Sequence, residues 1–591
     1  MQYAGSLTYL PILLATAGAC IAGTPQEVAP RIHPELARHT DLFAKKIYKV
    51  ADNVYCAVGW NVANIVMIVG DDGIILVDAQ LSPVTSHAVL EEFRKITDKP
   101  LKAIIYSHFH HDHIDGVKGL VSAGEVESGK VAIYAHSSMM ANLVDESATL
   151  GPILGVRAGY SFGFFLGDKD KEGMNAGTGP LPTGGGGSFI APTHTVDDYL
   201  KTTIAGVELE IIHVPSEAPD ELAIFLPSSG VLIDTEVIQG PAFPNMHTLR
   251  GTKYRDPVAW VASIDKLRRL KPQYLVPTHG QPVYGPERAE EVLRMTRDGI
   301  QYVHDQTVRQ MNKGLTPDEL VEVVRLPPHL AEYTPYLREY YGTVKQAVRQ
   351  IYNGYLGWFQ GDPVDLDPVP PTSRAQRLVE LMGGRDPVLK AARKAYEDGE
   401  YQWTAELATY LIRIDHGDSD ARHLKANAFR QLGYSSININ WRNWYLTSAM
   451  ELDGALGDGV NAARMASIFT PADIVTETPA AISIAGWTSR LRAEDALDTR
   501  MSLGFVFTDL EESYTLTIRR GVCQFDVGLT DPDIVITLTK AAYNRFLLGT
   551  TGLLDAVRGG DAGLHGEPAD LQKFLNHFEP AGNSRISLTV H

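Results

Sequence analysis

The stretch Ser107-His108-Phe109-His110-His111-Asp112-His113 gathers metal-ligating side chains directly after an apolar run. His108, His110, Asp112 and His113 follow the spacing H-x-H-x-D-H. Two imidazoles two residues apart can converge on one cation, and a carboxylate with the next histidine can turn to a second cation nearby. The whole chain has only 19 histidines, so this density indicates a metal site rather than a chance cluster.

Short β-branched runs alternate with helical patterns over residues 41–310, which is typical of an α/β fold. The runs Ile65–Val69 and Ile74–Val77 flank a predicted tight turn, and Leu101–Tyr106 leads straight into the His-rich stretch. Several predicted strands end in polar residues, so this scaffold is expected to present its chemistry on loops. The remaining strands predicted here are 207–214, 231–233 and 274–276, and the Gly- and Pro-rich residues 163–195 predict a long loop.

The pattern becomes helical after about residue 311 and mixed in the last segment. Beyond a Pro/Asp-rich linker at 362–371, apolar residues at three-and-four spacing predict three helices, 391–401, 404–414 and 421–432. The last segment predicts strands 514–518 and 535–538 and helices 541–548 and 569–578. Its aromatic residues Trp487, Phe505 and Phe507 suit either an ordinary core or an apolar groove.

The H-x-H-x-D-H stretch is the signature of the metallo-β-lactamase fold, and residues 41–310 resemble that superfamily in the order of their motifs. Many members next carry His in an H-T-P-G-H turn, where this chain has His213-Val214-Pro215-Ser216-Glu217. The bridging acidic position falls on Glu236, with Asp234 as the other candidate, and a last His matches His279. The resemblance implies an αββα sandwich.

Two Glu ligands, together with Pro244-Asn245-Met246-His247-Thr248-Leu249-Arg250-Gly251, resemble the alkylsulfatase branch of this superfamily. Tyr341-Gly342-Thr343-Val344 and Gly357-Trp358-Phe359 fit that branch too. The resemblance covers nearly the whole chain. It implies a catalytic domain at 41–310, an all-helical dimerisation domain at 311–457 and an α+β sterol-carrier-like domain at 465–591.

The same resemblance implies two zinc ions per chain, with a metal-activated water as nucleophile. His108, His110 and Glu217 would hold the first ion. The second would be held by Asp112, His113 and His279, with Glu236 bridging the two, so that Asp112 and Glu236 are also the catalytic carboxylates. Because the site has three carboxylates and no cysteine, manganese or iron is also conceivable.

Arg250 offers a planar fork suited to oxyanions, and the resemblance places it near the sulfate with Asn245 and Tyr341. Arg255, beside Asp256, is expected to form a structural ion pair with that neighbour. Some secondary-alkyl members of the branch have a His proton donor just before the bridging Glu. Thr235 occupies that position here.

The 591-residue chain carries 53 Lys+Arg against 71 Asp+Glu, a formal net charge of −18, which argues against a general nucleic-acid or anionic-membrane binder. The apolar stretch Leu7–Gly23 is short for a membrane span and broken by Pro11. Residues 1–23 are therefore read as a possible signal peptide without stable membrane insertion. That reading implies a secreted or periplasmic protein, and a cytoplasmic one if the segment is not a signal.

Together with these observations, the resemblance implies a homodimeric hydrolase that cleaves alkyl sulfate esters such as dodecyl sulfate, a small amphiphilic substrate, to alcohol and inorganic sulfate. Two alternatives stay open. The same dinuclear site could act on a phosphoester, a lactone or a β-lactam, because Arg250 suits a phosphate as well as a sulfate. The chain could also be a non-catalytic lipid-binding metalloprotein with a structural metal site. The ligand set argues against this, because structural zinc sites are usually closed sets of four Cys or His ligands.

Overall fold

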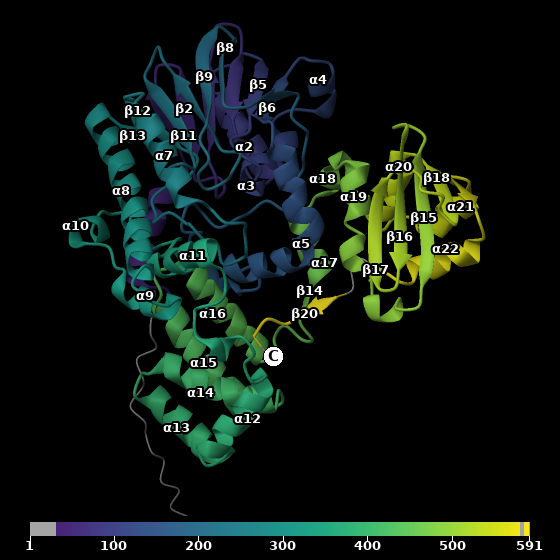
Figure 1. Cartoon of the computed structure of the whole chain (residues 1–591). Helices are drawn as coiled ribbons and strands as arrows, with labels where there is room; N and C mark the ends of the chain where they lie inside the picture. Colours follow the sequence, from purple (N-terminus) through teal and green to yellow (C-terminus); the bar gives the residue numbers. More distant parts are fainter. Residues whose placement is uncertain (1–30, 580–583, 590–591) are drawn as a thin grey trace, which may run out of the picture.

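The computed structural model describes residues 31–579 and 584–589, so the predicted signal segment 1–23 lies outside the described residues. Figure 1 shows three parts: an α/β part at the top, a helical part below it and an α+β part to one side. Among the described residues, no helix is long and apolar enough to cross a bilayer.

The α/β part, which the resemblance implies to be catalytic and which we call the catalytic part, is built on two facing sheets, each with its strands in sequence order. The strands predicted at 65–69 and 74–77 are present with those bounds, and the predicted 101–106 strand ends one residue earlier. The first sheet contains β1 Lys46–Ala51, β2 Val54–Val58, β3 Ile65–Val69, β4 Ile74–Val77, β5 Leu101–Ile105, β6 Ala132–His136 and β7 His194–Val196. The second contains β8 Tyr199–Ile204, β9 Val207–His213, β10 Leu222–Leu226, β11 Val231–Thr235, β12 Tyr274–Pro277 and β13 Val283–Tyr284.

The central strands of each sheet, such as β4 and β11, are buried on both faces, which explains why they read as continuous apolar runs, whereas the edge strand β8 alternates between exposed and less exposed residues. Between the sheets, residues such as Ile75 and Ile224 form one core. The outer face of the first sheet packs on Phe93 of α2, and the outer face of the second packs on Trp260 of α7. The predicted αββα sandwich is therefore confirmed. Its helices are α1 Pro34–His39, α2 Pro83–Arg94, α3 His111–Ile114, α4 Ala123–Glu127, α5 Met139–Ser161, α6 Asp168–Lys171, α7 Pro257–Arg268 and α8 Pro286–Met311.

The Gly- and Pro-rich stretch 163–195 forms little regular structure, as expected, but it is packed rather than free. It contains the short helix α6 and an isolated bridge between Asn175 and Pro180. Asn175 and Phe189 are buried, and the Asn175 side chain donates hydrogen bonds to Leu36 O and Thr40 Oγ1. This stretch therefore forms a fixed wall of the catalytic part.

The helical part contains the three predicted helices as α13 Arg385–Glu397, α14 Tyr401–Ile414 and α15 Ser419–Ser435. The first begins six residues earlier than the apolar pattern indicated, because its first turn follows directly after Gly383-Gly384, both with positive φ. The other helices of this part are α9 Pro317–Val323, α10 Pro328–Ala331, α11 Val344–Leu356, α12 Pro371–Leu381 and α16 Ile439–Leu452.

The C-terminal part is an α+β unit with a five-stranded sheet in the order β17-β16-β15-β18-β19. Trp487, Phe505 and Phe507 are buried in its core, so the core interpretation of these aromatics is the one that holds. Its strands are β15 Arg500–Phe507, β16 Glu512–Arg519, β17 Val522–Val527, β18 Ile534–Leu538 and β19 Ala562–His565, and its helices α17 Ala462–Phe469, α18 Ala472–Glu477, α19 Ala480–Ala485, α20 Lys540–Leu547, α21 Leu553–Gly559 and α22 Pro568–Leu575. A two-stranded sheet of β14 Val460–Asn461 and β20 Arg585–Ile586 closes it.

We expect Ile224→Ala to destabilise the catalytic part, because Ile224 is fully buried between the two sheets and its truncation leaves a cavity. Such changes cost about 2–5 kcal/mol. The matched control is Val84→Ala on α2, where the side chain is 66% exposed and the change should stay within about 0.5 kcal/mol. Differential scanning calorimetry compares the two. Equal unfolding midpoints would contradict the packing described here.

Candidate metal centre

The His-rich stretch lies where β5 ends and the short helix α3 begins. His108 and His110 precede the helix, while Asp112 and His113 belong to its single turn. The backbone is anchored on both sides, since Ser107 N donates to Asp78 Oδ1 and Ala79 N donates to His113 O. A strand, a tight loop and one helical turn thus present four ligand-type side chains toward one place.

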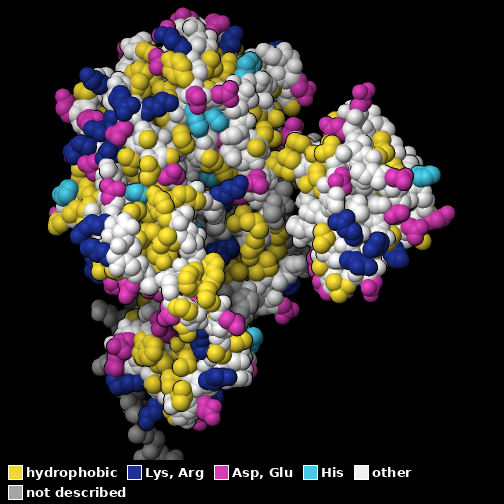
Figure 2. All heavy atoms as spheres, in the orientation of Figure 1, with side chains coloured by type: hydrophobic (Ala, Val, Ile, Leu, Met, Phe, Trp, Pro, Cys, Tyr) yellow, Lys and Arg dark blue, Asp and Glu magenta, His cyan; other side chains and the backbone are white. Residues whose placement is uncertain are grey.

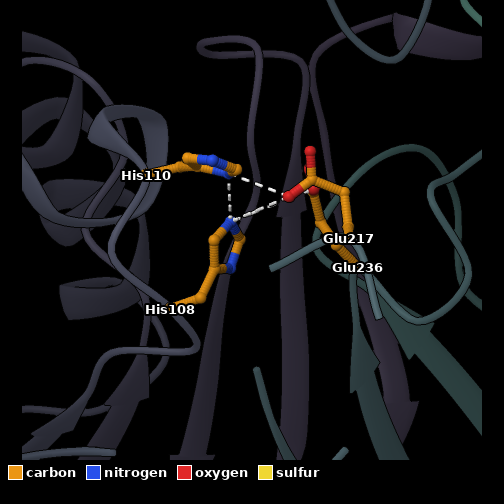
Figure 3. Close-up of side chains that lie close together, drawn as sticks. All are labelled: His108, His110, Glu217 and Glu236. Atoms are coloured by element: carbon orange, nitrogen blue, oxygen red, sulfur yellow. Dashed lines mark hydrogen bonds and ion pairs between the residues drawn. The ribbon is translucent and has the colours of Figure 1, made fainter. Parts of the chain in front are cut away.

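One group of ligand atoms combines His108, His110, Glu217 and Glu236, which lie within 4.8 Å of one another. Figure 3 shows the two imidazoles facing the two carboxylates. His108 Nε2 lies 2.9 Å from His110 Nδ1, and His110 Nδ1 lies 2.9 Å from Glu217 Oε2. Glu217 follows β9 in the second sheet, so this group joins the two halves of the sandwich.

A second group combines Asp112, His113, Glu236 and His279, again within 4.8 Å. Glu236 belongs to both groups. Its Oε1 is 3.4 Å from His113 Nε2 and also contacts His279 Nε2, whereas its Oε2 is 3.9 Å from His108 Nε2. Glu236 therefore offers one oxygen toward each group, and the geometry around it suits a bridging carboxylate.

The residues that support Glu236 are under backbone strain. Thr235, a β-branched residue, has a φ of 55°, which such residues rarely adopt. Its hydroxyl donates to Glu221 Oε1 at 2.5 Å, and Glu236 N donates to the same oxygen at 3.0 Å. The buried Glu221 carboxylate thus holds the turn that directs Glu236 into the site.

Three of the four imidazoles of the site are oriented by partners on the side that faces away from it. His113 Nδ1 lies 2.7 Å from Asp78 Oδ2, His279 Nδ1 lies 2.8 Å from Val62 O, and His108 Nδ1 lies 3.0 Å from Ser107 Oγ and 3.4 Å from Glu221 Oε2. Metal-binding histidines characteristically engage their second ring nitrogen in this way. With His113 Nε2 buried and without a hydrogen-bond partner among the described residues, the set fits divalent metal ions.

The electrostatics of the site agree with a cluster of ligands. Although burial alone would raise the pKa of Glu236, His279 and His113 hold it well below its usual range. Likewise, burial would raise the pKa of Glu217, but Arg255 and His110 lower it. Both carboxylates are therefore anionic at neutral pH, which is the form that binds a cation.

The sequence-based expectation for Arg255 is wrong. Its guanidinium pairs with Glu217 rather than with the adjacent Asp256, and it also donates to Asn245 O at 2.6 Å. Asp256 instead caps the N-terminus of α7 by accepting a hydrogen bond from Val258 N. A helix N-cap turns its side chain toward its own helix, so that Asp256 is not available to its neighbour.

The site lies in a cavity with an empty volume of about 1020 Å³, its open mouth included. Arg250 and Tyr341 line it together with the ligand residues. Burial, with the negative charges of Asp112 and Glu217, raises the pKa of the Tyr341 phenol, so that this group stays protonated and can donate a hydrogen bond. The rest of the wall is largely apolar and is formed mainly by α5 and the loop after it: Leu143, Leu154, Ala158, Phe162 and Phe164.

Arg250 and Asn245 are placed differently from each other. The Arg250 guanidinium forms a partly buried ion pair with Glu146 of α5 inside the cavity. Asn245 is buried and is not among the residues that line the cavity; its backbone contacts Gln239 and Arg255, and both polar atoms of its side chain lack a partner among the described residues. The cavity thus brings Arg250 and Tyr341, but not Asn245, to the ligand cluster.

Sequence reasoning missed Asp78, Glu221 and Glu146. Asp78 follows the predicted strand 74–77 directly, and polar residues at strand ends were the signal that pointed to the other ligands. Glu221 lies four residues after Glu217 and directly before β10, so it too is an acidic residue at a strand end. Glu146 lies within a long helix and carries no sequence signal.

Comparison with known proteins decides the family. The metallo-beta-lactamase superfamily model matches residues 58–279, the alkyl sulfatase dimerisation model 316–455, and the alkyl sulfatase C-terminal model 469–584. A linear primary-alkylsulfatase from Pseudomonas sp. (strain ATCC 19151) is 56% identical over 529 residues, 89% of this chain and 100% of that protein. The chain belongs to the alkylsulfatase family.

More distant relatives of the family agree. An (R)-specific secondary-alkylsulfatase from Pseudomonas sp. is 33% identical and covers 94% of this chain and 85% of its own length. Among solved structures, the stereoselective inverting sec-alkylsulfatase Pisa1 from Pseudomonas sp. has a TM-score of 0.84 at 32% identity, covering 93% of this chain and 87% of that one. This chain is therefore a sulfatase enzyme with the metallo-β-lactamase fold, a helical dimerisation region and a C-terminal domain.

We expect Arg255→Met to destabilise the catalytic part by about 3–5 kcal/mol, because it leaves the buried Glu217 carboxylate without its cation. Thermal unfolding of chelator-treated protein measures this, so that the comparison concerns the chain alone. The control is Arg325→Met, whose side chain is 73% exposed and whose pair with Glu322 is worth at most about 1 kcal/mol. An unfolding midpoint for Arg255→Met as high as that of the control would refute the assigned pairing.

Proposed function

We propose that this sulfatase hydrolyses alkyl sulfate esters such as dodecyl sulfate to an alcohol and inorganic sulfate, as a homodimer with two zinc ions per chain. The observation that supports this most is the cavity itself. It joins a cluster of four imidazoles and three carboxylates to Arg250 at one side and to an apolar wall along α5. An amphiphile with an anionic head and an alkyl chain fits both surfaces.

In this proposal, His108, His110 and Glu217 would hold the first zinc ion. Asp112, His113 and His279 would hold the second, and Glu236, which belongs to both groups of ligand atoms, would serve both ions. When bound, such ions lower the pKa of a shared water and so provide hydroxide near neutral pH. All-N/O ligand sets of this kind also accept manganese or iron, which elemental analysis would distinguish from zinc.

The residues of the chain itself supply substrate positioning. Although burial alone would lower the pKa of Arg250, Glu146 holds it above its usual value, and the guanidinium stays charged. Its fork can hydrogen-bond two sulfate oxygens. The protonated Tyr341 hydroxyl donates to the sulfate from the same cavity, and Asn245 supports the site indirectly, because its carbonyl accepts a hydrogen bond from Arg255, the partner of Glu217.

The remaining assignments rest on the family and the sequence. The proposed domain boundaries are 41–310 for catalysis, 311–457 for dimerisation and 465–591 for a sterol-carrier-like domain. The dimerisation model at 316–455 supports a homodimer formed through the helical part. We also propose export, to the periplasm or outside the cell, on the basis of the apolar segment within residues 1–23.

A phosphoester is the second candidate substrate, since Arg250 pairs with phosphate as well as with sulfate. A lactone or β-lactam is less suited to the apolar wall, and a solely lipid-binding role conflicts with the sulfatase family of the chain. The names of the relatives favour the alkyl sulfate, and matched esters separate it from the phosphoester.

We expect sulfate release from dodecyl sulfate by wild-type protein, and a loss of at least about 100-fold in kcat/KM for Glu236→Gln. The amide would remove the negative charge that Glu236 places between the two groups of ligands. Two bound metal ions would then repel each other, or one of them would be lost. Ion chromatography measures the sulfate, and elemental analysis measures the metal content. Glu208→Gln on the exposed face of β9 is the matched control.

A chelator should abolish the release in wild-type protein, and added zinc should restore it. The same preparation is offered dodecyl phosphate. Metal-loaded wild-type protein that releases phosphate but no sulfate would identify a phosphoester as the substrate. Protein that releases neither would contradict both assignments.

We expect Ala158→Leu to shift the preference toward short chains. Ala158 lines the apolar wall and is 1% exposed, so a larger side chain there takes space from an alkyl tail. Because each buried methylene contributes about 0.8 kcal/mol, kcat/KM for dodecyl sulfate should fall at least about tenfold relative to that for hexyl sulfate. The control is Ala141→Leu on the exposed face of the same helix. An unchanged ratio would show that the chain does not lie along α5.

A further inference from the structure

The segment that joins α11 to α12, residues 355–371, contains no buried residue, and we call it the arm. Its only regular structure is the short 3₁₀ turn Pro363–Asp365, apart from the helix ends. Yet it carries large apolar side chains in water: Trp358 is 66% exposed, Val364 68% and Leu366 60%. Figure 2 shows hydrophobic side chains gathered on this face, around α11 and over the helical part below it.

An exposed apolar segment of this length is unusual in a protein that works alone. Single exposed apolar residues are common, but contiguous ones mark a surface that another molecule covers. The arm lies within residues 316–455, the region matched by the dimerisation model. The region that carries the exposed residues is thus the one associated with self-association.

The arm is also acidic. It contains Asp362, Asp365 and Asp367 and no Lys or Arg. Asp362 caps the 3₁₀ turn by accepting a hydrogen bond from Val364 N, whereas Asp365 and Asp367 have no side-chain partner in the part of the chain that the structure describes. Whatever covers the arm should therefore offer aromatic surface together with positive charge.

One surface with those properties is a second cavity, with an empty volume of about 980 Å³ including its mouth. It lies between α11 and α16 and is lined by Trp441, Trp444 and Tyr445 and by the cations Lys345 and Arg349. These half-exposed cations pair with more exposed carboxylates, Lys345 with Glu322 at 3.4 Å and Arg349 with Asp318 at 2.8 Å. Exposed pairs of that kind exchange at little cost. We call this the basic-aromatic cavity.

Gln346 indicates what kind of molecule the basic-aromatic cavity binds. It lines the cavity, is 7% exposed, and neither its Nε2 nor its Oε1 has a hydrogen-bond partner among the described residues. A buried amide without partners costs free energy unless a ligand satisfies it. Its adjacent donor and acceptor match the C=O and N–H of a peptide group, which an alkyl chain does not offer.

We propose that the arm of one chain docks in the basic-aromatic cavity of a second copy, and reciprocally, so that two such contacts hold the dimer. This inference rests on the proposed homodimer and names its contact surface. Asp365 and Asp367 meet Lys345 and Arg349, the apolar side chains of the arm pack on the aromatic wall, and Gln346 binds the backbone of the arm. A two-fold dimer makes both contacts equivalent.

Docking there also supports the catalytic cavity. Arg157, which lines the basic-aromatic cavity, donates from Nε to Arg250 O at 2.8 Å and from Nη2 to Leu249 O at 2.7 Å. The guanidinium lies 5.2 Å from the centre of the Trp444 ring. In the proposed dimer the partner's arm therefore packs behind the loop that carries Arg250 and stabilises the substrate-binding end of each site.

Charge reversal tests this pairing. The arm variant is Asp365→Lys with Asp367→Lys, and the cavity variant is Lys345→Glu with Arg349→Glu. Alone, each variant sets like charges against each other in both contacts, and its dimer dissociation constant should rise at least about tenfold. Mixed in equal amounts, the two variants form a heterodimer in which both contacts are again opposite in charge. Light scattering should then show the dimer restored. KM for dodecyl sulfate, which should rise in each variant alone, should return toward the wild-type value in the mixture.

The control is Lys95→Glu with Lys130→Glu, two exposed cations of the catalytic part, which should leave the wild-type dimer unchanged. A monomeric wild type would overturn the homodimer itself. A dimeric wild type with dimeric single-sided variants would overturn only the arm contact, as would dissociated variants that fail to pair on mixing. Laurate binding lost only in the cavity variant, with every variant dimeric, would instead assign this cavity to a small amphiphile.

Discussion

The shared position of Glu236 between two groups of imidazoles is the interaction on which the rest of the catalytic part depends. One carboxylate faces His108 with one oxygen and both His113 and His279 with the other. Since a buried carboxylate among neutral groups would tend to become protonated, its anionic state depends on the positive charge around it. Removing any of these partners changes the charge balance of all of them.

That constraint explains why the supporting residues come from so many segments. Asp78 and Val62 belong to the first sheet and its loops, whereas Glu221 and Thr235 belong to the second. Asp78, Val62 and Glu221 each contact the outer nitrogen of one histidine, and Thr235, in a strained conformation, donates to Glu221. A sandwich in which both sheets direct loops to the same edge can supply such support, because rigid strands fix where each loop starts. The buried sheets thus stabilise an arrangement of polar groups that would not hold together by itself.

The His-rich stretch could be predicted from its spacing and from the apolar run before it, whereas the ligand roles of Glu217, Glu236 and His279 came from the family resemblance. Such runs are strong local signals, and Ile65–Val69 and Ile74–Val77 appear with the expected bounds. The pairings of Arg255 with Glu217 and of Arg250 with Glu146 could not be predicted, because they join segments far apart in the chain. Sequence adjacency favours Asp256 as the partner of Arg255, whereas Glu217 comes close to Arg255 only in the folded chain. Local patterns identify which residues are polar and buried, while tertiary packing decides which of them meet.

Helix α5 shows how the three parts act on one cavity. One face of it lines the apolar wall, and Arg157 on another face holds the Arg250 loop. At Gly155 the helix meets α17, which begins the C-terminal part, and a Cβ atom there would lie only 2.8 Å from the backbone of Met465 and Ala466. Thr470, directly after α17, reaches the same cavity. Helix α5 contacts α16 of the helical part as well as α17 of the C-terminal part. A displacement of either part would therefore change the shape of the apolar wall along which we place the alkyl chain. Both additional parts therefore contact the helix that forms the apolar wall, although neither contributes a ligand to the two groups described above.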